Sequence, residues 1–282
     1  MSGDRRHPAL RRVFLLSGGG NDFIALLAEE GRPSPEEVRR LCRRGLSLGA
    51  DGLLLLARDE NGVGMSYHTR DGSPAALCLN GARCAAELAF HLGWGKGTLE
   101  VAAAGAPPLV ATRPGPHTIA LQVPVPAAPP RKVALPLGEE TVEGWRVDTG
   151  VPHLVVWWPG PVSEAPLARL GPSLRHHPAL GTAGTNVDLV RIPERGRLEI
   201  RSYERGVEGE TLACGTGVLA AVAVGLAEGR LALPVTADTA GGFSFLVDGR
   251  VQDGQLASWS LVGDARLLLQ GELLPGSLVS PN

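Results

Sequence analysis

Lysine, long apolar runs and an excess of one charge are all missing from this sequence of 282 residues. Only two of its 27 basic residues are lysines, Lys96 and Lys132, so we expect no pyridoxal phosphate, which needs a Schiff-base lysine. The longest apolar run, 218–227, is far shorter than the roughly 20 residues of a bilayer span. With a formal net charge of −2, no nucleic-acid or membrane partner is expected.

Cysteine is sparse, and its spacing matches no zinc-binding pattern. The four cysteines are Cys42, Cys78, Cys84 and Cys214. No signal peptide is predicted, because only residues 13–16 form an apolar stretch after the first arginines. We therefore expect a cytoplasmic protein with reduced thiols, no disulfide framework and no metal site.

The composition, 44% hydrophobic and 20% charged, is that of a soluble globular chain. The length fits two domains of about 140 residues each. Nine prolines lie between Gly105 and Pro136, a density that predicts edge strands and a stiff connector. We therefore predict one half over residues 1–128, a second half over 129–262 and a C-terminal tail over 263–282.

Three pairs of similar stretches occur in the same order in the two halves. Their offsets are nearly constant, which predicts a duplicated unit. The pairs are 20–26 with 150–156, 49–54 with 184–189, and 78–81 with 214–217, and a predicted helix follows each member of the third pair.

Two predicted helices, Asn80–Leu92 and Thr216–Ala227, are apolar on nearly every side and must be buried all round. A third, Ser34–Arg44, begins with a capping serine and has one apolar face. Short β-rich segments flank these helices. The predicted fold class is α+β, with two pseudo-symmetric domains, each a curved mixed β-sheet or barrel around a central buried helix, and an active site in the cleft between them.

Cys78 and Cys214 each precede a turn that opens one of the buried helices. The positive end of a helix dipole lowers the pKa of a thiol, and its free amides can bind a carboxylate. Two thiols that act from opposite faces of one carbon would invert its configuration, one removing a proton and the other delivering one. The alternative is that both cysteines fill the core, which is the reading we prefer for Cys84, in the middle of a helix.

At these residues the chain resembles the diaminopimelate epimerase family. The resemblance extends from residue 18 to residue 217, and its most specific block is the last. The matching stretches are Gly-Gly-Gly-Asn-Asp-Phe at 18–23, Gly-Ala-Asp-Gly at 49–52, Asp-Gly-Ser at 71–73, Asn-Gly-Ala-Arg-Cys at 80–84, Pro-His at 152–153, Gly-Thr-Asn-Val at 184–187, and Tyr-Glu-Arg-Gly through Glu-Thr-Leu-Ala-Cys-Gly-Thr-Gly at 203–217.

The resemblance implies a cofactor-independent conversion of LL-2,6-diaminopimelate to the meso form, in the synthesis of lysine and peptidoglycan precursors. It also implies a homodimer and a C-terminal strand that returns to the first half.

The resemblance assigns roles to ten residues. Cys78 and Cys214 would exchange the proton, assisted by His153 and Glu204. The reacting carboxylate would be bound by the amides around Asn80 and around Gly215 and Thr216. The rest of the substrate would be held by Asn21, Asn186, Glu204 and Arg205, with the guanidinium of Arg205 facing the distal carboxylate.

Three positions depart from the family pattern. Thr69 and Val151 stand where the family has asparagine, and Leu79 stands where glycine follows the first thiol. Loss of two amide side chains would remove hydrogen bonds to a polar substrate. Three alternatives stay open. The departures leave room for a related racemase for another amino acid and for a descendant of the family without catalytic activity. The third is a redox or binding protein in which the two thiols form a reversible disulfide.

Overall fold

The computed structural model describes residues 10–75, 77–252 and 255–274. The chain divides into two compact units. The first contains the residues up to Ile119 and those from Asp264 onward, and the second contains Ala120–Gly263. The predicted boundary at 128/129 lies between the last strand of the first half and the first strand of the second. No helix in the described part of the chain is long and apolar enough to cross a membrane.

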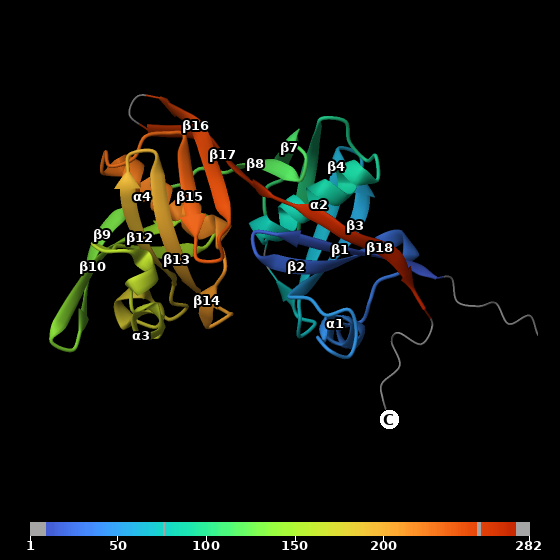
Figure 1. The fold of residues 1–282 in the computed structure, drawn as a ribbon, viewed down its shortest axis with the longest axis horizontal. Helices are drawn as coiled ribbons and strands as arrows, with labels where there is room; N and C mark the ends of the chain where they lie inside the picture. Colours follow the sequence, from blue (N-terminus) through green and yellow to red (C-terminus); the bar gives the residue numbers. More distant parts are fainter. Residues whose placement is uncertain (1–9, 76, 253–254, 275–282) are drawn as a thin grey trace, which may run out of the picture. The chain divides into compact units, whose positions relative to one another are not determined.

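The first unit consists of strands around one long helix, with a shorter helix outside (Figure 1). The division between the two units falls within strand β8. The elements are β1 (Arg11–Gly18), β2 (Asn21–Leu27), η1 (Ala28–Glu30), α1 (Pro35–Cys42), β3 (Gly52–Asp59), β4 (Gly62–Thr69), β5 (Pro74–Ala75), α2 (Leu79–His91), β6 (Thr98–Ala103), β7 (Leu109–Gly115), β8 (Thr118–Val123) and β18 (Arg266–Leu273).

The second unit repeats this order of elements, again with one long central helix and one outer helix. Its elements are β9 (Arg131–Leu137), β10 (Glu140–Asp148), β11 (Pro152–Trp157), η2 (Val162–Glu164), α3 (Leu167–Arg175), η3 (Pro178–Leu180), β12 (Asn186–Glu194), β13 (Arg197–Glu204), β14 (Gly209–Thr211), α4 (Gly215–Ala227), β15 (Val235–Thr239), β16 (Ser244–Gln252) and β17 (Gln255–Asp264).

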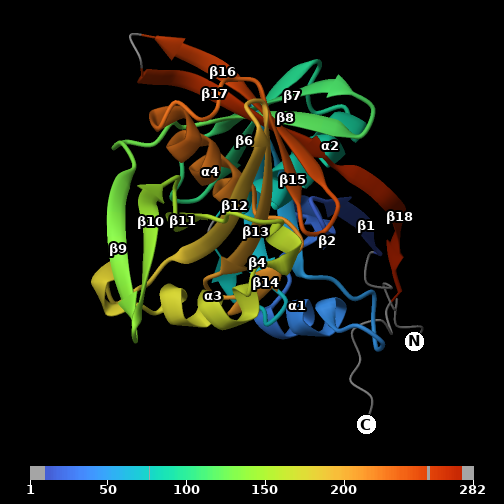
Figure 2. The ribbon, with the colours of Figure 1, turned by 60° about the vertical axis from the view of Figure 1, so that its left-hand side comes forward.

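Strand pairing is the same in both units. In the first, β2 pairs antiparallel with β1 and parallel with β3, and β4 pairs antiparallel with β3 and parallel with β6. In the second, β11 and β13 make the corresponding pairs with β10, β12 and β15. This mixed, sheet-dominated architecture confirms the predicted α+β fold of two pseudo-symmetric halves (Figures 1 and 2).

The strand registers shift one of the three predicted sequence matches by one residue. Phe23 pairs with Gly52 in the first unit, and His153 pairs with Asn186 in the second. The structural counterpart of Asn186 is therefore Gly52, whereas the letters alone paired it with Asp51. Strand pairs have a side-chain period of two, so a shift of one residue changes which side chains are compared.

One strand of the first unit comes from the far end of the chain. Strand β9 pairs with β10, which directly follows it, whereas β18 pairs with β1 from Arg11↔Leu273 to Ser17↔Arg266. The first unit therefore completes its sheet with a segment that is distant in sequence.

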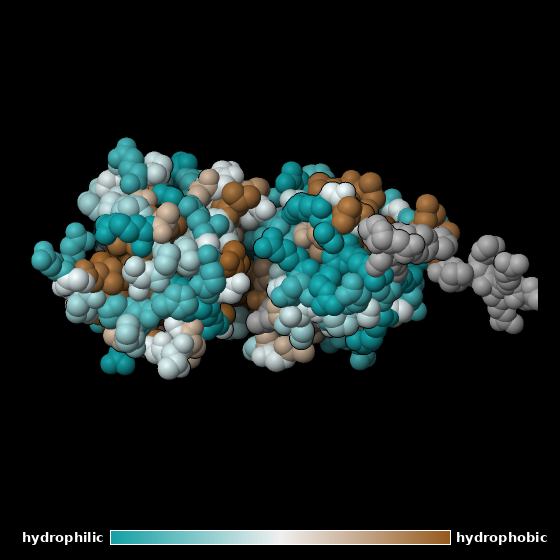
Figure 3. Space-filling view, turned by 90° about the horizontal axis from the view of Figure 1, so that it is seen from below, coloured by the Kyte–Doolittle hydropathy of each residue, from teal (hydrophilic) through white to brown (hydrophobic). Residues whose placement is uncertain are grey.

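Helices α2 and α4 are buried over most of their length, as apolar helices must be in a globular protein. Helix α2 contacts strands β1–β4, β6, β7 and β18, and α4 contacts β10–β12 and β16. Helix α1 begins at a capping box in which Ser34 and Glu37 bond each other's backbone. On the face in Figure 3, hydrophilic residues cover most of each unit, and hydrophobic ones form separate patches.

Candidate active site

Cys214 is the N-cap residue of α4 and is 7% exposed. Its Sγ lies 3.4 Å from Oγ1 of Thr216, and it accepts a hydrogen bond from the Gly217 amide. The first amides of a helix have no partner within the helix, so those of Gly215 and Thr216 can donate to an anion at this position. Cys214 and the polar groups around it therefore form a candidate site in the second unit, named its half-site below.

A chain of polar contacts leads from Cys214 into the core. His153 lies on β11, and its Nε2 is 3.0 Å from Oγ1 of Thr216. Its Nδ1 is 2.7 Å from Oδ2 of Asp188, which lies on the neighbouring strand β12. Ser202 on β13 donates to Oδ1 of Asp188 at 2.6 Å. Because Asp188 and His153 are both buried, this contact fixes the orientation of the imidazole ring.

Gly217 allows the carboxylate to lie directly under the helix. A Cβ at this position would stand 2.5 Å from Oδ1 of Asp188 and 3.1 Å from Oγ of Ser202. Real Cβ contacts are longer, so any larger residue would displace Asp188. The second glycine of the Cys-Gly-Thr-Gly stretch is thus required by the approach of a buried carboxylate.

Glu204 is the titratable group next to the thiol. Its carboxylate accepts hydrogen bonds from the hydroxyl of Thr211 and from the thiol of Cys214. Burial raises the pKa of Glu204 above its ordinary value, although both hydrogen bonds and His153 act in the opposite direction. A carboxyl with a raised pKa can hold a proton closer to neutral pH than a surface glutamate does.

The thiol of Cys214 departs from the expectation for a helix start. Burial raises its pKa well above the ordinary value, and the charges of Glu204 and Asp188 add to the effect. The hydrogen bonds from Thr216 and Gly217 oppose the rise without cancelling it. The expected lowering by the helix terminus is wrong for this thiol, because desolvation and two nearby carboxylates outweigh the dipole.

Asn186 and Arg205 lie at the edge of the same half-site. Oδ1 of Asn186 accepts the backbone N–H of Arg205 at 2.8 Å, and Nδ2 of Asn186 is 3.3 Å from Nε2 of His153. The guanidinium of Arg205 forms no ion pair with any residue in the described part of the chain. It is therefore available to a carboxylate from outside the protein.

The first unit holds the other half-site, at the start of α2. Cys78 is the N-cap residue of this helix and is half-buried. Two residues later, the buried Asn80 donates from Nδ2 to Oδ1 of Asn21 at 2.9 Å and to the carbonyl of Gly19 at 3.3 Å. Nδ2 of Asn21 in turn donates to Oδ2 of Asp51 at 3.1 Å. The two predicted asparagines are thus bonded to each other beside the helix start.

An arginine that the sequence analysis did not single out supports this half-site. Arg83 is fully buried and donates to Oδ1 of Asn80 at 2.6 Å and to the carbonyl of Asp264 at 3.2 Å. Desolvation lowers its pKa. Asp264 also accepts the Gly19 amide at 2.8 Å. The start of α2 is therefore tied to the C-terminal segment that enters this unit with β18.

Leu79 causes no backbone strain at the position where the family pattern has glycine. It is the first residue of α2, is 6% exposed and has no positive φ. Gly215, at the corresponding position of α4, has no positive φ either. Thr69 uses its hydroxyl within its own turn, donating to Oδ1 of Asp71 at 2.5 Å. Of the three departures, only Val151 leaves an aliphatic side chain half-buried, two residues before the predicted site residue His153.

Asp188 and Ser202 are the functional candidates that sequence reasoning missed. The signal for Asp188 was present, because it stands alone among the apolar residues 187–190 of a predicted strand. A charge in such a run must find a buried partner or be neutralised. Ser202 gave no such signal, because a serine on a strand is ordinary. Among the described residues, no group of three or more His, Cys, Asp or Glu could hold a metal ion.

Comparison with known sequences points to one family. A family model described as diaminopimelate epimerase matches residues 146–255. A diaminopimelate epimerase of Gemmatimonas aurantiaca is 33% identical, and the match covers 92% of this chain and 97% of that protein. A diaminopimelate epimerase of Aquifex aeolicus is 35% identical over 76% of this chain and 81% of the relative.

Comparison with solved structures identifies the fold. A Bacillus anthracis phenazine biosynthesis protein of the PhzF family matches with a TM-score of 0.68 and 13% identity, covering 94% of this chain and 99% of the other. A hydroxyproline epimerase from Agrobacterium vitis matches with a TM-score of 0.67 and 14% identity, covering 97% and 94%. At such low identity these likenesses concern the architecture alone.

Proposed function

This chain belongs to the diaminopimelate epimerase family, and on that premise we propose that it converts LL-2,6-diaminopimelate to the meso isomer with the thiols of Cys78 and Cys214. The observation that supports this most is the duplicated helix start. In each unit a cysteine is the N-cap of the central buried helix, and polar side chains gather beside it. Core-filling cysteines would need neither the free amides nor the polar neighbours.

In the proposed step, one cysteine acts as a thiolate and the other as a thiol. The thiolate removes the proton from the α-carbon, and its sulfur becomes a thiol. The other thiol gives its proton to the opposite face of the carbanion and becomes a thiolate, so proton and charge balance without a redox change. The raised pKa of Cys214 favours its neutral thiol form. Cys214 therefore suits the role of proton donor in the direction of the reaction in which Cys78 is the thiolate.

Each turnover leaves the two sulfurs in exchanged protonation states, so the enzyme must reset. We assign the reset of Cys214 to Glu204 and His153. Glu204 contacts the thiol and has a raised pKa, so it can return a proton to the sulfur. His153, held by Asp188, reaches the same sulfur through the hydroxyl of Thr216. Both groups assist proton transfer to a buried thiol.

The substrate carboxylates have different binding groups in this proposal. The carboxylate on the reacting carbon binds the amides at the helix starts, around Asn80 and around Gly215 and Thr216. The distal carboxylate binds the guanidinium of Arg205, whose planar donors match two oxygens. Asn21, Asn186 and Glu204 hold the distal amino and carboxyl groups by hydrogen bonds.

The test is hydrogen exchange at the α-carbon in D₂O, followed by chirality-resolving chromatography. We expect LL-diaminopimelate to take up deuterium while it forms the meso isomer, without added cofactor or metal. A protein that exchanges the α-proton of another amino acid but not that of diaminopimelate would refute the proposed substrate while keeping the chemistry.

A second candidate substrate class follows from Val151 and Leu79. Val151 places an aliphatic group where an asparagine could bond a polar substrate tail, and Leu79 places one where a glycine would leave the backbone open. The same assay should therefore include histidine, glutamate and hydroxyproline. Faster exchange on one of these than on diaminopimelate would assign the chain to a related racemase activity.

We also propose a homodimer in the cytoplasm, where reducing conditions would keep the catalytic thiols active. The proposed compartment follows from the proposed mechanism, which needs both thiols in the reduced state. Light scattering after size-exclusion chromatography measures the assembly. Loss of activity in mild oxidant and its return with reductant would show that the free thiols are needed.

A further inference from the structure

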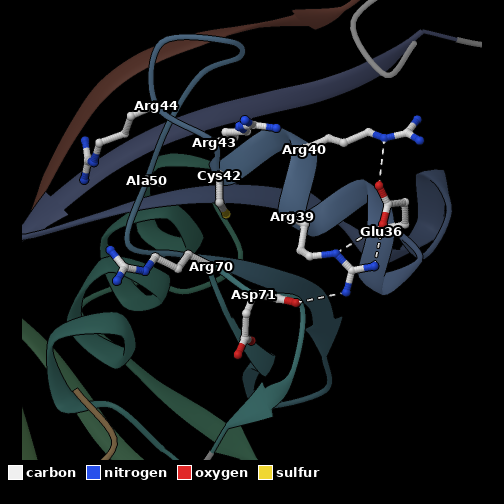
Figure 4. Close-up of a pocket in the computed structure, with 9 residues that line it drawn as sticks. All are labelled: Glu36, Arg39, Arg40, Cys42, Arg43, Arg44, Ala50, Arg70 and Asp71. Atoms are coloured by element: carbon white, nitrogen blue, oxygen red, sulfur yellow. Dashed lines mark hydrogen bonds and ion pairs between the residues drawn. The ribbon is translucent and has the colours of Figure 1, made fainter. Parts of the chain in front are cut away.

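Five arginines surround one pocket in the first unit. The pocket has a volume of about 500 Å³ and lies where the end of α1, the loop after it and the turn between β4 and β5 come together (Figure 4). Its arginines are Arg39, Arg40, Arg43, Arg44 and Arg70. The chain as a whole carries a net charge of −2, so this concentration of positive charge is local.

The carboxylates near the pocket do not fully neutralise its arginines. Five arginines and two carboxylates, Glu36 and Asp71, line it. Asp22 and Asp51 pair with Arg44 from outside the lining, so one positive charge remains in excess. Glu36 pairs with Arg39 and Arg40 on its own helix. The carboxylate of Asp71 instead accepts bonds within its own turn, from the hydroxyl of Thr69 and from the Ser73 amide at 2.9 Å. In Figure 4 this side chain points away from the arginines.

Two of the guanidinium groups form no ion pair within the described part of the chain, namely those of Arg43 and Arg70. They come from different elements, the loop after α1 and the turn after β4. Figure 4 shows them on opposite sides of the Cys42 side chain. Burial raises the pKa of this thiol to about 11, so it stays neutral and adds no negative charge of its own.

Arg44, the remaining arginine, pairs with carboxylates that do not line the pocket. Arg44 donates to Oδ1 of Asp22 at 2.6 Å and to Oδ1 of Asp51 at 3.0 Å, both outside the lining of the pocket. A helix C-terminus favours positive charge, and this accounts for Arg39 and Arg40 in the last turn of α1. It does not account for Arg70, which belongs to another element. Like charges repel each other, so an anion bound between the unpaired guanidinium groups of Arg43 and Arg70 would relieve their repulsion.

From this arrangement we infer that the pocket binds a small molecule with a phosphate or pyrophosphate group between Arg43 and Arg70. Guanidinium groups present planar, paired donors that match phosphate oxygens. The lining contains no aromatic residue on which a base would stack. The site therefore recognises the charged group itself and not a nucleobase or a single-stranded nucleic acid.

The test is isothermal titration calorimetry of the full chain with inorganic pyrophosphate. We expect one binding site, an affinity that falls with added sodium chloride, and an affinity at least about tenfold lower in the variant Arg43→Gln/Arg70→Gln. The matched control is Arg58→Gln, which removes the same charge from an exposed position on β3 outside the pocket. Its affinity should equal that of the unaltered protein.

Further arms separate the sources of the phosphate. Orthophosphate, adenosine triphosphate and a short single-stranded RNA are titrated in the same way. Tighter binding of adenosine triphosphate than of pyrophosphate would show a nucleotide site, which contradicts recognition of the charged group alone. RNA binding without pyrophosphate binding, no pyrophosphate binding by the unaltered protein, or an equal loss in Arg58→Gln would each overturn the proposal.

The variants also have a readout that does not depend on the ligand. Removal of Arg43 and Arg70 relieves repulsion, so the melting temperature without anion should stay the same or rise. Pyrophosphate should raise the melting temperature of the unaltered protein and of Arg58→Gln but not that of the double variant. If the double variant does not fold, the single variant Arg70→Gln replaces it in both measurements. The epimerase assay is not used, so failure here leaves the proposed function untouched.

Discussion

The two helix starts differ most in what lies beneath them. At Gly217 a Cβ would meet the carboxylate of Asp188 and the hydroxyl of Ser202, whereas at the corresponding Gly81 it would stand 3.2 Å from Leu54 Cδ2 and 3.7 Å from Phe23 Cε1. The same fold thus places polar side chains beneath the start of α4 and apolar side chains beneath the start of α2.

The strand registers show that these are the same positions in the two units. Asp188 pairs with Ser202, and Leu54 pairs with Tyr67. His153 corresponds to Phe23, whose ring packs edge-on against Tyr67 with the centroids 5.9 Å apart. Duplication therefore kept the backbone and the thiol, and the polar side chains beneath the thiol were kept or acquired in one unit only.

Burial gives a physical reason for this difference. Cys214 is buried, so its proton must travel through protein groups, and His153, Thr216 and Glu204 supply that route. Cys78 is half-buried and needs no such relay, because water can reach it. We infer that the thiol of Cys214 exchanges its proton with solvent more slowly than the thiol of Cys78 does.

The largest effect should come from removing either thiol. Cys78→Ala and Cys214→Ala should each lower kcat by about 10³-fold or more, since each removes one of the two acid–base groups. Chirality-resolving chromatography measures the loss. Cys84→Ala, on the buried side of α2, should keep most of the activity. Equal losses in all three variants would mean that packing, and not proton transfer, explains the result.

Glu204→Gln should lower kcat by about 10²-fold, because a glutamine cannot return a proton to Cys214. Its stability should change in a defined direction. The raised pKa means that folding favours protonated Glu204, so stability is highest below the ordinary pKa and falls as the pH rises through the raised value. The variant should therefore melt higher than the unaltered protein at pH 8 and equally at pH 4.

The control for this experiment has the opposite sign. Glu208 has a pKa lowered by the Gly206 amide and by Arg175, and it lies at the surface. Glu208→Gln should lose stability at pH 8 and keep its activity. If both variants melt alike at pH 8, the buried environment of Glu204 is not what sets its pKa.

Asp188→Asn should have a smaller effect on rate, about tenfold, because the imidazole loses its charged partner but keeps its position. Its sharper readout is the reactivity of Cys214. The Asp188 charge raises the pKa of this thiol, so its removal should shift alkylation by iodoacetamide to lower pH. Peptide mass spectrometry follows Cys214 alone. Ser202→Ala, which keeps the charge, should show no shift downward.

The smallest expected effect compares the two glycines directly. Gly81→Ala faces the end of a flexible leucine side chain and gains helix propensity, so its melting temperature should change little or rise. Gly217→Ala meets Asp188 at 2.5 Å and should cost about 1–3 kcal/mol. Thermal unfolding of both variants measures the difference. An equal loss of stability in both variants would mean that the side chains beneath the two helix starts constrain the glycines alike.

Much of the fold could be predicted because it depends on local patterns. The all-apolar helices α2 and α4 begin within one residue of their predicted starts, and the capping serine marks the start of α1. Helix α3 escaped prediction because Gly171 and Pro172 interrupt it. Gly171 packs against the Tyr203 ring, which is a tertiary reason for a glycine inside a helix.

The sequence by itself determined the duplication, the α+β class and the placement of one thiol at each helix start, because periodicity, capping and glycine positions are read along the chain. Only the tertiary structure decided the state of Cys214, since its pKa depends on Asp188 and Glu204, which come from other strands. The same holds for Arg83, which contacts Asp264 across a sequence separation of 181 residues. Charges act through space, and burial is known only when the whole chain has folded.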